Sequence, residues 1–144
     1  PTSHLLLSQM SELANPKALY QATCDSNSEP YALQNIGDMM SPEFSENCII
    51  IVDPSMQIHP KAFVIVDFKD ELYFRQYIEE GNKKILRCLN SEYKDIELGN
   101  IFKVRGCVVQ QKQRKQKSLH YYLPNNITGE LEFNMNGKVK LINS

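Results

Sequence analysis

The stretch Asn35–Phe44, NIGDMMSPEF, has the layout of a catalytic loop in which the reactive residue is missing. A strand-like run, residues 31–36, leads into Gly37 and Asp38, and a Ser-Pro pair beyond them can open a turn or a helix. Met39 stands where such a loop carries its nucleophile. A thioether has no proton to lose and reacts poorly with an amide carbonyl, so the first question is whether this chain performs chemistry at all.

Cysteine and histidine, the other residue types that carry chemistry, are scattered. The four cysteines, Cys24, Cys48, Cys88 and Cys107, lie 24, 40 and 19 positions apart. This spacing matches neither a set of paired metal ligands nor a redox Cys-x-x-Cys motif. Three of them lie in apolar runs and are predicted to be buried free thiols of a reducing compartment. The three histidines have no second ligand at helical or hairpin spacing, so no metal and no cofactor is expected.

Length and composition predict one globular domain. A chain of 144 residues can bury a single core without disulfides or metals, and 42% hydrophobic with 23% charged residues is ordinary for a globular protein. The apolar run Leu5–Leu7 is short and follows no basic residue, so neither a signal peptide nor a membrane span is expected. The expected location is the cytoplasm. Pro1 in place of an initiator Met suggests a fragment of a longer protein.

Charge is unevenly distributed along the chain. Residues 1–60 hold seven acids and one Lys, whereas residues 61–144 hold fifteen bases and ten acids. The most basic segment is QQKQRKQK, residues 110–117. Its bases are Lys112, Arg114, Lys115 and Lys117. Between a phosphate-binding patch and a solvated strand end, the second interpretation is favoured because no aromatic residue is interleaved and no helix carries the charges. No helix-turn-helix fits the sequence, so this chain alone is not expected to read DNA.

Hydrophobic periodicity along most of the chain is that of β-strands. Short β-branched or alternating runs are separated by turn residues such as Lys69-Asp70 and Gly81-Asn82. The expected strands are residues 48–53, 62–68, 71–78, 83–89 and 101–109. Only residues 5–20 have helical spacing, and Pro16 limits that helix to about two turns. The pattern predicts a mainly β fold of hairpins.

The C-terminal segment carries the strongest local signal. In residues 131–142, LEFNMNGKVKLI, two alternating runs flank Asn136-Gly137, the preferred dipeptide of a type I′ turn. This predicts a β-hairpin with one apolar face. That face would consist of Leu131, Phe133, Met135, Val139 and Leu141. Because an isolated hairpin is marginal in water, the face is expected to pack on the chain's own domain in preference to a partner subunit.

Taken in order, these runs resemble the C-terminal self-cleaving peptidase domain of LexA, the lambda-type phage repressors and UmuD. The resemblance covers residues 31–110. The family's nucleophile motif is Gly-Asp-Ser-Met followed by a short turn. The residues that match it are Gly37, Asp38, Met40, Ser41 and Pro42. The strand of the family's catalytic lysine resembles ELYFRQYI, residues 71–78, where Arg75 takes the lysine's place. The next segment, EEGNKKILRCLNSEYKDI, is similar to the hairpin and strand that follow in the family.

The resemblance implies a mainly β, LexA/signal-peptidase-like fold of hairpins and twisted sheets, with the C-terminal hairpin added. It divides the chain into three parts. Residues 1–30 would be an N-terminal extension with a short helix, and residues 31–110 the peptidase-fold core. Residues 111–144 would be a basic strand or loop and a hairpin belonging to the same domain.

The departures from the family fall on the residues that carry its chemistry. In these proteins a serine hydroxyl attacks a peptide bond while a neutral lysine removes its proton. Met39 would be the vestigial nucleophile position and Arg75 the vestigial lysine position, and an arginine cannot act as the base because it keeps its charge. The family's cleavage site, an Ala-Gly or Cys-Gly bond, is absent from the sequence. An inactive fold is therefore predicted, in which a buried Arg75 needs Asp38 or Glu43 as an ion-pair partner.

Binding is the function that remains. The resemblance implies a dimerisation and regulatory domain of a LexA- or phage-repressor-like transcriptional regulator, with DNA bound only through a helix-turn-helix domain outside this chain. A regulatory protein or peptide is a further candidate partner, for the vestigial cleft. Two alternatives stay open: a self-cleaving peptidase with an unrecognised nucleophile, and a stand-alone UmuD-like accessory protein.

A homodimer is expected to form around residues 100–112. The run IFKVRGCVV, residues 101–109, indicates a partly covered strand in which Phe102 and Val104 face one side and Cys107 the other. The predicted interface residues are Phe102, Val104, Cys107 and Val109.

Overall fold

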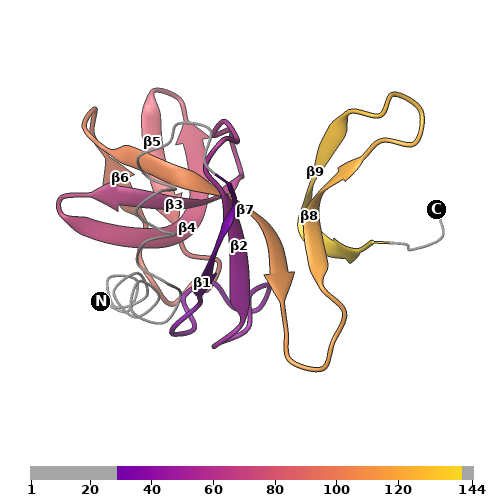
Figure 1. The fold of residues 1–144 in the computed structure, drawn as a ribbon. Coiled ribbons are helices and arrows are strands. Elements are labelled where there is room, and N and C mark those ends of the chain that lie inside the picture. The colour runs from indigo at the N-terminus through magenta and orange to yellow at the C-terminus, as the bar shows by residue number, and fades with distance from the viewer. Residues whose placement is uncertain (1–28, 141–144) are drawn as a thin grey trace.

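The fold is built from β-strands (Figure 1). A computed structural model describes residues 29–140, which form nine strands and, within that range, no helix. The strands are β1 (Tyr31–Gln34), β2 (Ile49–Asp53), β3 (Phe63–Phe68), β4 (Glu71–Glu80), β5 (Lys83–Arg87), β6 (Ile96–Leu98), β7 (Lys103–Lys112), β8 (Leu119–Pro124) and β9 (Leu131–Val139). The mainly β fold class is confirmed, while the helix predicted in residues 5–20 lies outside the described residues.

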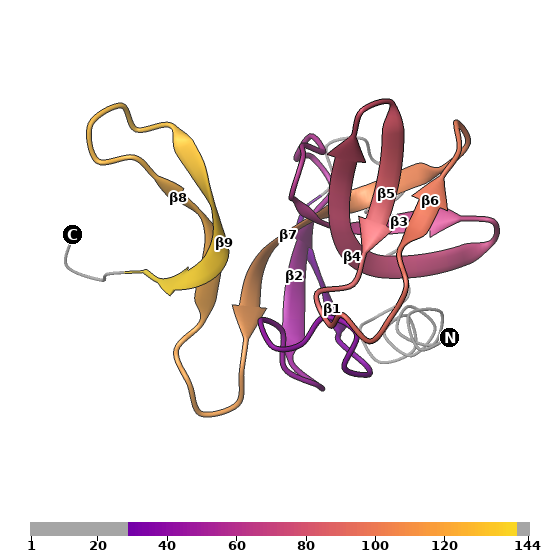
Figure 2. The same ribbon diagram turned by 180° about the vertical axis from the view of Figure 1, so that it is seen from behind.

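β7 is the central element of a single antiparallel sheet. The strand order is β1-β2-β7-β3-β4-β5-β6, and β8 pairs with both β7 and β9. The first half of β7, Lys103 to Cys107, pairs with β3, and the second half, Cys107 to Lys112, pairs with β2. Gln110 and Gln111 also pair with the start of β8. β7 thereby joins the body of the sheet to the β8–β9 hairpin (Figures 1 and 2).

The two faces of β3 separate two hydrophobic clusters. Side chains alternate across a strand, so Phe63 and Ile65 enter one cluster while Val64 and Val66 enter the other. The Phe44 cluster consists of Leu33, Met40, Phe44, Cys48, Ile50, Val52, Phe63, Ile65, Phe74, Val108 and Tyr121. The Cys107 cluster consists of Ala62, Val64, Val66, Phe68, Tyr77, Leu86, Leu98 and Cys107. The near-continuous apolar run of β3 in the sequence reflects burial on both faces.

The predicted hairpin at Asn136-Gly137 is wrong. These residues lie inside β9, which continues through them and pairs with β8. The chain reverses earlier, between β8 and β9 over residues 125–130. A two-residue turn with positive φ at both positions, as type I′ requires, occurs instead at Lys69-Asp70 (φ 51° and 65°), between β3 and β4.

Close packing explains the glycine at position 137. His120 pairs with Lys138 and Tyr122 with Phe133, so residues 134–137 form a bulge in β9 opposite Tyr121. A Cβ on residue 137 would lie 2.7 Å from Cβ of Leu119 and 2.9 Å from Cζ of Tyr121. The Asn-Gly pair therefore marks the approach of two strands, which only glycine allows, and not a chain reversal.

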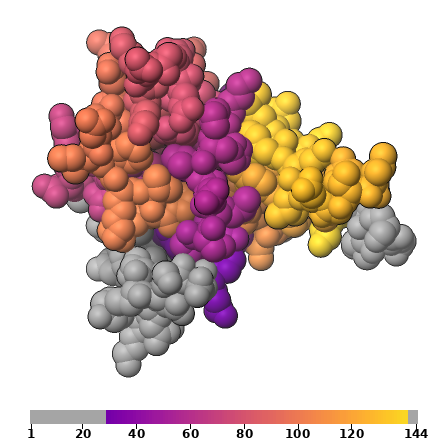
Figure 3. Space-filling model, turned by 90° about the horizontal axis from the view of Figure 1, so that it is seen from above, coloured from indigo at the N-terminus to yellow at the C-terminus, as the bar shows by residue number. Residues whose placement is uncertain are grey.

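We refer to residues 112–140, comprising the β7–β8 turn and the β8–β9 hairpin, as the arm. It projects from the body of the molecule (Figures 1–3). Phe133 packs against the Phe44 cluster, in which Tyr121 of β8 is fully buried, so packing on the chain's own domain is confirmed for Phe133. It is wrong for Leu131 and Val139, which stay 60% and 40% exposed in the single chain. Met135 is 44% exposed, but its sulfur accepts a hydrogen bond from the Gln76 side-chain amide of β4 at 3.3 Å.

Candidate functional site

The loop Gly37–Phe44, between β1 and β2, carries the motif residues. Hydrogen bonds from the Ser41 N–H to the Asp38 carbonyl (3.1 Å) and from the Phe44 N–H to the Met40 carbonyl (3.0 Å) shape it into consecutive turns. The Phe44 ring is fully buried and lies 4.9 to 5.0 Å from three other aromatic rings. This anchor holds the backbone of the motif against the sheet.

Met39 lies beside residues 88–93, the segment that begins just after β5. Its side chain is 6% exposed, and its carbonyl accepts a hydrogen bond from the Asn90 N–H at 3.1 Å. The Asn90 side-chain amide donates to the Asp38 carbonyl at 3.2 Å, and the Tyr93 hydroxyl donates to the Asp38 carboxylate at 2.6 Å. The hydrogen bond to Asp38 raises the pKa of Tyr93. The motif loop is thus tied directly to the segment 88–93.

Arg75 borders the same segment from β4. Its side chain is 5% exposed, Nη1 donates to the Phe74 carbonyl at 2.8 Å, and the guanidinium carbon lies 5.3 Å from the centre of the Tyr73 ring. Nε is buried and has no hydrogen-bond partner. Burial lowers the pKa of Arg75, and its neighbours Cys88 and Tyr93 oppose that shift. Because a guanidinium stays charged even so, the site contains a buried cation.

The predicted ion pair between Arg75 and Asp38 or Glu43 is wrong. Among residues 29–140, no carboxylate lies within 4.0 Å of the Arg75 guanidinium. Asp38 accepts the hydrogen bond from Tyr93 instead. The ion pairs found in this range are Arg87 with Glu80, Arg87 with Asp95, and Arg105 with Asp67.

The pleat of β4 explains why Glu43 is out of reach. Arg75 pairs with Val64, whose side chain lies in the Cys107 cluster, so the two side chains share that face of the sheet. Glu43 bonds toward the opposite face, where its carboxylate accepts hydrogen bonds from the Tyr121 hydroxyl at 2.6 Å and the Gly137 N–H at 3.1 Å. The loop therefore uses Glu43 to hold the arm.

Cys88 belongs to this site although its sequence context did not single it out. Burial raises the pKa of the Cys88 thiol, and the opposing effect of Arg75 is smaller. The thiol therefore stays protonated, and the thiolate is the nucleophilic form. The Ser41 hydroxyl, another candidate nucleophile, donates a hydrogen bond to the Phe44 carbonyl at 3.4 Å. In the β4–β5 hairpin Gln76 pairs with Arg87, so the next residues, Arg75 and Cys88, lie opposite each other. The register of this hairpin was the signal that could have placed Cys88 near Arg75.

The predicted interface residues are divided between the surface and the core. Phe102, Val104 and Val109 are half-buried, whereas Cys107 is fully buried and cannot contact a partner directly. The predicted alternation fails because of a bulge in β7: Ile65 pairs with Gly106 and Val66 with Val104. The register shift places Phe102, Val104 and Cys107 against the same cluster.

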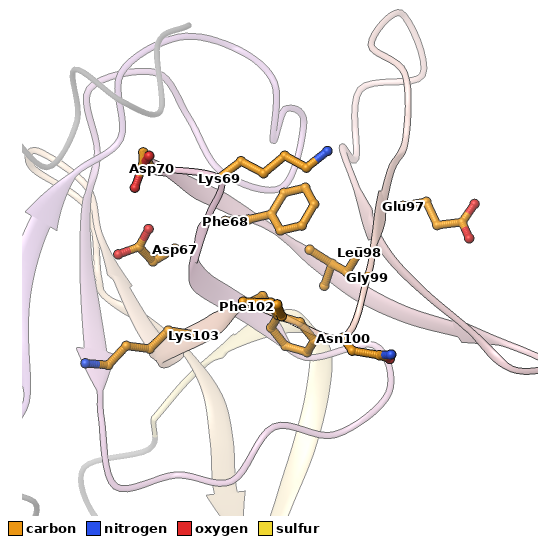
Figure 4. A pocket seen from close by; sticks show the side chains of 11 residues that line it. Asp67, Phe68, Lys69, Asp70, Glu97, Leu98, Gly99, Asn100, Phe102 and Lys103 are labelled. Atoms are coloured by element: carbon orange, nitrogen blue, oxygen red, sulfur yellow. The ribbon is translucent and has the colours of Figure 1, made fainter.

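An open groove of about 820 Å³ lies at the β3–β4 turn and the β6–β7 loop (Figure 4). Phe68, Leu98 and Phe102 supply its apolar side chains, with charged residues such as Lys69 and Lys103 around them. Ile101, which also lines the groove, is 89% exposed. Part of the predicted dimer interface therefore coincides with an apolar depression at the surface.

Comparison with known proteins agrees with this architecture. The model of the Peptidase S24-like family matches residues 8–109, which is more than half of the chain. The chain belongs to the Peptidase S24-like family. Membership in this S24 family confirms the resemblance stated from the motifs around Gly37 and Arg75.

A phage repressor is among the relatives of this S24 chain. Repressor protein C2 of Salmonella phage P22 is 27% identical over 99 residues, which cover 65% of this chain and 46% of the phage protein. The S24 chain thus spans about half the length of this curated relative. Within residues 29–140, no helix is long and apolar enough to cross a membrane, and no three His, Cys, Asp or Glu side chains are grouped to hold a metal ion.

Proposed function

We propose that this chain is the dimerisation and regulatory domain of a repressor-like transcriptional regulator, with a peptidase fold that performs no cleavage. The proposal rests on the side chains at the two positions that the motif resemblance assigns to the family's nucleophile and lysine. A buried thioether, Met39, and a buried guanidinium, Arg75, offer neither a nucleophile nor a base. The match to a phage repressor over about half of that protein's length supports the regulatory role.

In this proposal DNA sequence is read by a separate helix-turn-helix domain, and this chain supplies the two-fold contact that pairs two such domains. Such a regulator acts in the cytoplasm. A regulatory protein or peptide that binds beside residues 88–93 is a further candidate partner. If the reading frame encodes no helix-turn-helix domain, the alternative function, that of a UmuD-like accessory protein, would be favoured.

The chain is expected to stay intact when incubated at about pH 9.5, where a catalytic lysine of lowered pKa is neutral. Arg75 remains charged and Met39 remains unreactive under these conditions. Mass spectrometry of the intact protein should show one mass over several days. The double variant Met39→Ser/Arg75→Lys should also stay intact, because the sequence offers no Ala-Gly or Cys-Gly bond. A specific cut within residues 1–30 would instead establish a peptidase, and Cys88→Ala would test its nucleophile.

The dimer is expected to depend on the β6–β7 loop. Ile101→Glu places a charge on a side chain that is 89% exposed at the rim of the apolar groove, so it should weaken a dimer there by about ten- to a hundredfold while leaving the fold intact. Ile127→Glu is the matched control, since Ile127 is 93% exposed on the arm. Sedimentation velocity at tens of micromolar measures both. A monomeric wild type, or an equal effect of the two variants, contradicts an interface at residues 100–112.

A further inference from the structure

The arm differs in charge from the rest of the molecule. Residues 29–111 hold nine bases and thirteen acids, whereas the arm, residues 112–140, holds six bases and two acids. The arm, which projects from the body, therefore carries a net positive charge, whereas the rest of the described chain carries a net negative charge (Figures 1 and 2). A polyanion approaching this molecule is repelled by the body and attracted to the arm.

Strand pairing gathers the six bases at one end of the arm. Leu119 pairs with Val139 and His120 with Lys138, so the end of β9 lies next to the β7–β8 turn. The gathered bases are Lys112, Arg114, Lys115, Lys117, Lys138 and Lys140, and all six are exposed. The two acids, Glu130 and Glu132, lie at the other end, where β9 pairs with Leu123 and Pro124. The sequence segment 110–117 thus supplies four of the six bases of a patch, and the fold adds the other two from the end of β9 and the residue that follows it.

The basic turn is held in place from inside the molecule. The Gln113 side-chain amide donates to the Ser45 hydroxyl at 3.0 Å and to the Gln111 side-chain carbonyl at 2.8 Å, and Gln111 itself is fully buried. Across the turn, the Gln116 N–H donates to the Gln113 carbonyl at 3.3 Å. Because the backbone is already ordered, binding an anion loses less conformational entropy than it would on a free loop.

We propose that this basic end of the arm binds the phosphate backbone of double-stranded DNA without regard to base sequence. Gln116 and Ser118, which lie beside the bases, are hydrogen-bond donors of the kind that contact phosphate oxygens. No aromatic or large apolar side chain lies between Lys112 and Lys117, as insertion into a lipid surface would require. Phosphate contacts position a protein on the duplex without reading it, so this activity is separate from sequence recognition by another domain.

The test is fluorescence anisotropy of the 144-residue chain with two labelled duplexes of unrelated sequence. Both duplexes should bind equally, and affinity should fall by about a thousandfold between about 50 and 200 mM salt if all six bases neutralise phosphates. The variant Lys112→Gln/Arg114→Gln/Lys115→Gln/Lys117→Gln should bind at least about tenfold more weakly and lower the logarithmic salt slope by about 3 to 4. The matched control Lys61→Gln/Lys83→Gln/Lys84→Gln/Lys94→Gln removes the same charge from exposed sites of the body that do not line the groove, and it should bind like the wild type.

Each other outcome overturns the proposal. Equal losses in the two quadruple variants would mean that net charge, and not the arm, attracts DNA. No binding at about 50 mM salt, or a preference for one duplex, would remove backbone binding as the arm's activity. Tighter binding to phosphatidylserine-containing vesicles, lost in the arm variant, would assign the arm to a membrane surface. Sedimentation of the arm variant, run in parallel, measures whether it still forms the proposed dimer. It thereby separates a loss of DNA binding from a loss of dimerisation.

Discussion

Truncation of Tyr121 is expected to cause the largest loss of stability of any side chain in the arm. Tyr121→Ala should lower the free energy of unfolding by about 3 to 5 kcal/mol, and Tyr121→Phe by about 1.5 to 3 kcal/mol. Tyr121 is fully buried, stacks on Phe44 at 5.0 Å, donates to the Glu43 carboxylate at 2.6 Å and accepts from the Gln111 amide at 2.9 Å. Phe keeps the ring but removes the hydroxyl, so the Glu43 carboxylate loses a charge-assisted hydrogen bond. Urea unfolding of both variants measures the difference.

The adjacent tyrosine provides the control. The Tyr122 hydroxyl also makes a short hydrogen bond, 2.6 Å to Nε2 of His59, but this partner is an imidazole and Tyr122 is only half-buried. Tyr122→Phe should therefore lose about 0.5 to 1.5 kcal/mol, the range of an ordinary hydrogen bond. Equal losses for Tyr121→Phe and Tyr122→Phe would show that Glu43 does not hold the arm through its charge.

The pH dependence of stability gives an independent check on Tyr121. Burial, reinforced by the hydrogen bond to Glu43, raises the pKa of Tyr121 above the value near 10 of an exposed tyrosine. Above about pH 10 the unfolded chain releases this proton while the folded chain keeps it. The contribution of Tyr121 is therefore complete below about pH 10 and is lost as the pH rises further. Tyr121→Phe should show a smaller loss of stability with rising pH than the wild type.

The body of the fold could be predicted from the sequence because its strands obey local rules. The short β-branched apolar run of β3 and the turn residues Lys69-Asp70 that follow it are local signals, because each can be recognised from neighbouring residues alone. Asn136-Gly137 misled because a turn and a close approach both select glycine, and only the packing against Leu119 and Tyr121 distinguishes them. Four of the six bases of the basic patch were visible in the sequence, whereas Lys138 and Lys140 join residues 112–117 only through the pairing of β8 with β9.

The motif order singled out two residues that the structure brings to one place, but it did not predict their contacts. The motif order located Met39 and Arg75, and the structure places both beside residues 88–93. The partners of their neighbours depend on which face of the sheet each side chain occupies. A shift of one residue in strand register moves a side chain to the other face, and the sequence alone does not give the register. Asp38 therefore bonds to Tyr93 and Glu43 to Tyr121, and neither reaches Arg75.

Removal of the buried charge at position 75 is expected to stabilise the protein. Arg75→Met keeps a long side chain but removes a cation whose Nε has no hydrogen-bond partner, so the free energy of unfolding should rise by about 1 to 3 kcal/mol. The matched control is Arg87→Met, which removes an exposed arginine paired with Glu80 and Asp95 and should lose less than about 1 kcal/mol. Urea unfolding at neutral pH compares the two. A loss of stability in Arg75→Met would mean that an anion already compensates the guanidinium.

Arg75→Lys tests the same burial through pH. A lysine at this position, 5% exposed in the wild type, should have its pKa lowered by burial below the value of about 10.4 in the unfolded chain. Between the folded and unfolded pKa values the unfolded state binds more protons, so the stability of Arg75→Lys should rise with pH in that window. The wild type should lack this rise because its guanidinium does not titrate there. Parallel pH profiles for the two proteins would show that the side chain at position 75 is not desolvated. A lysine at this position would then stay charged and could not act as a base.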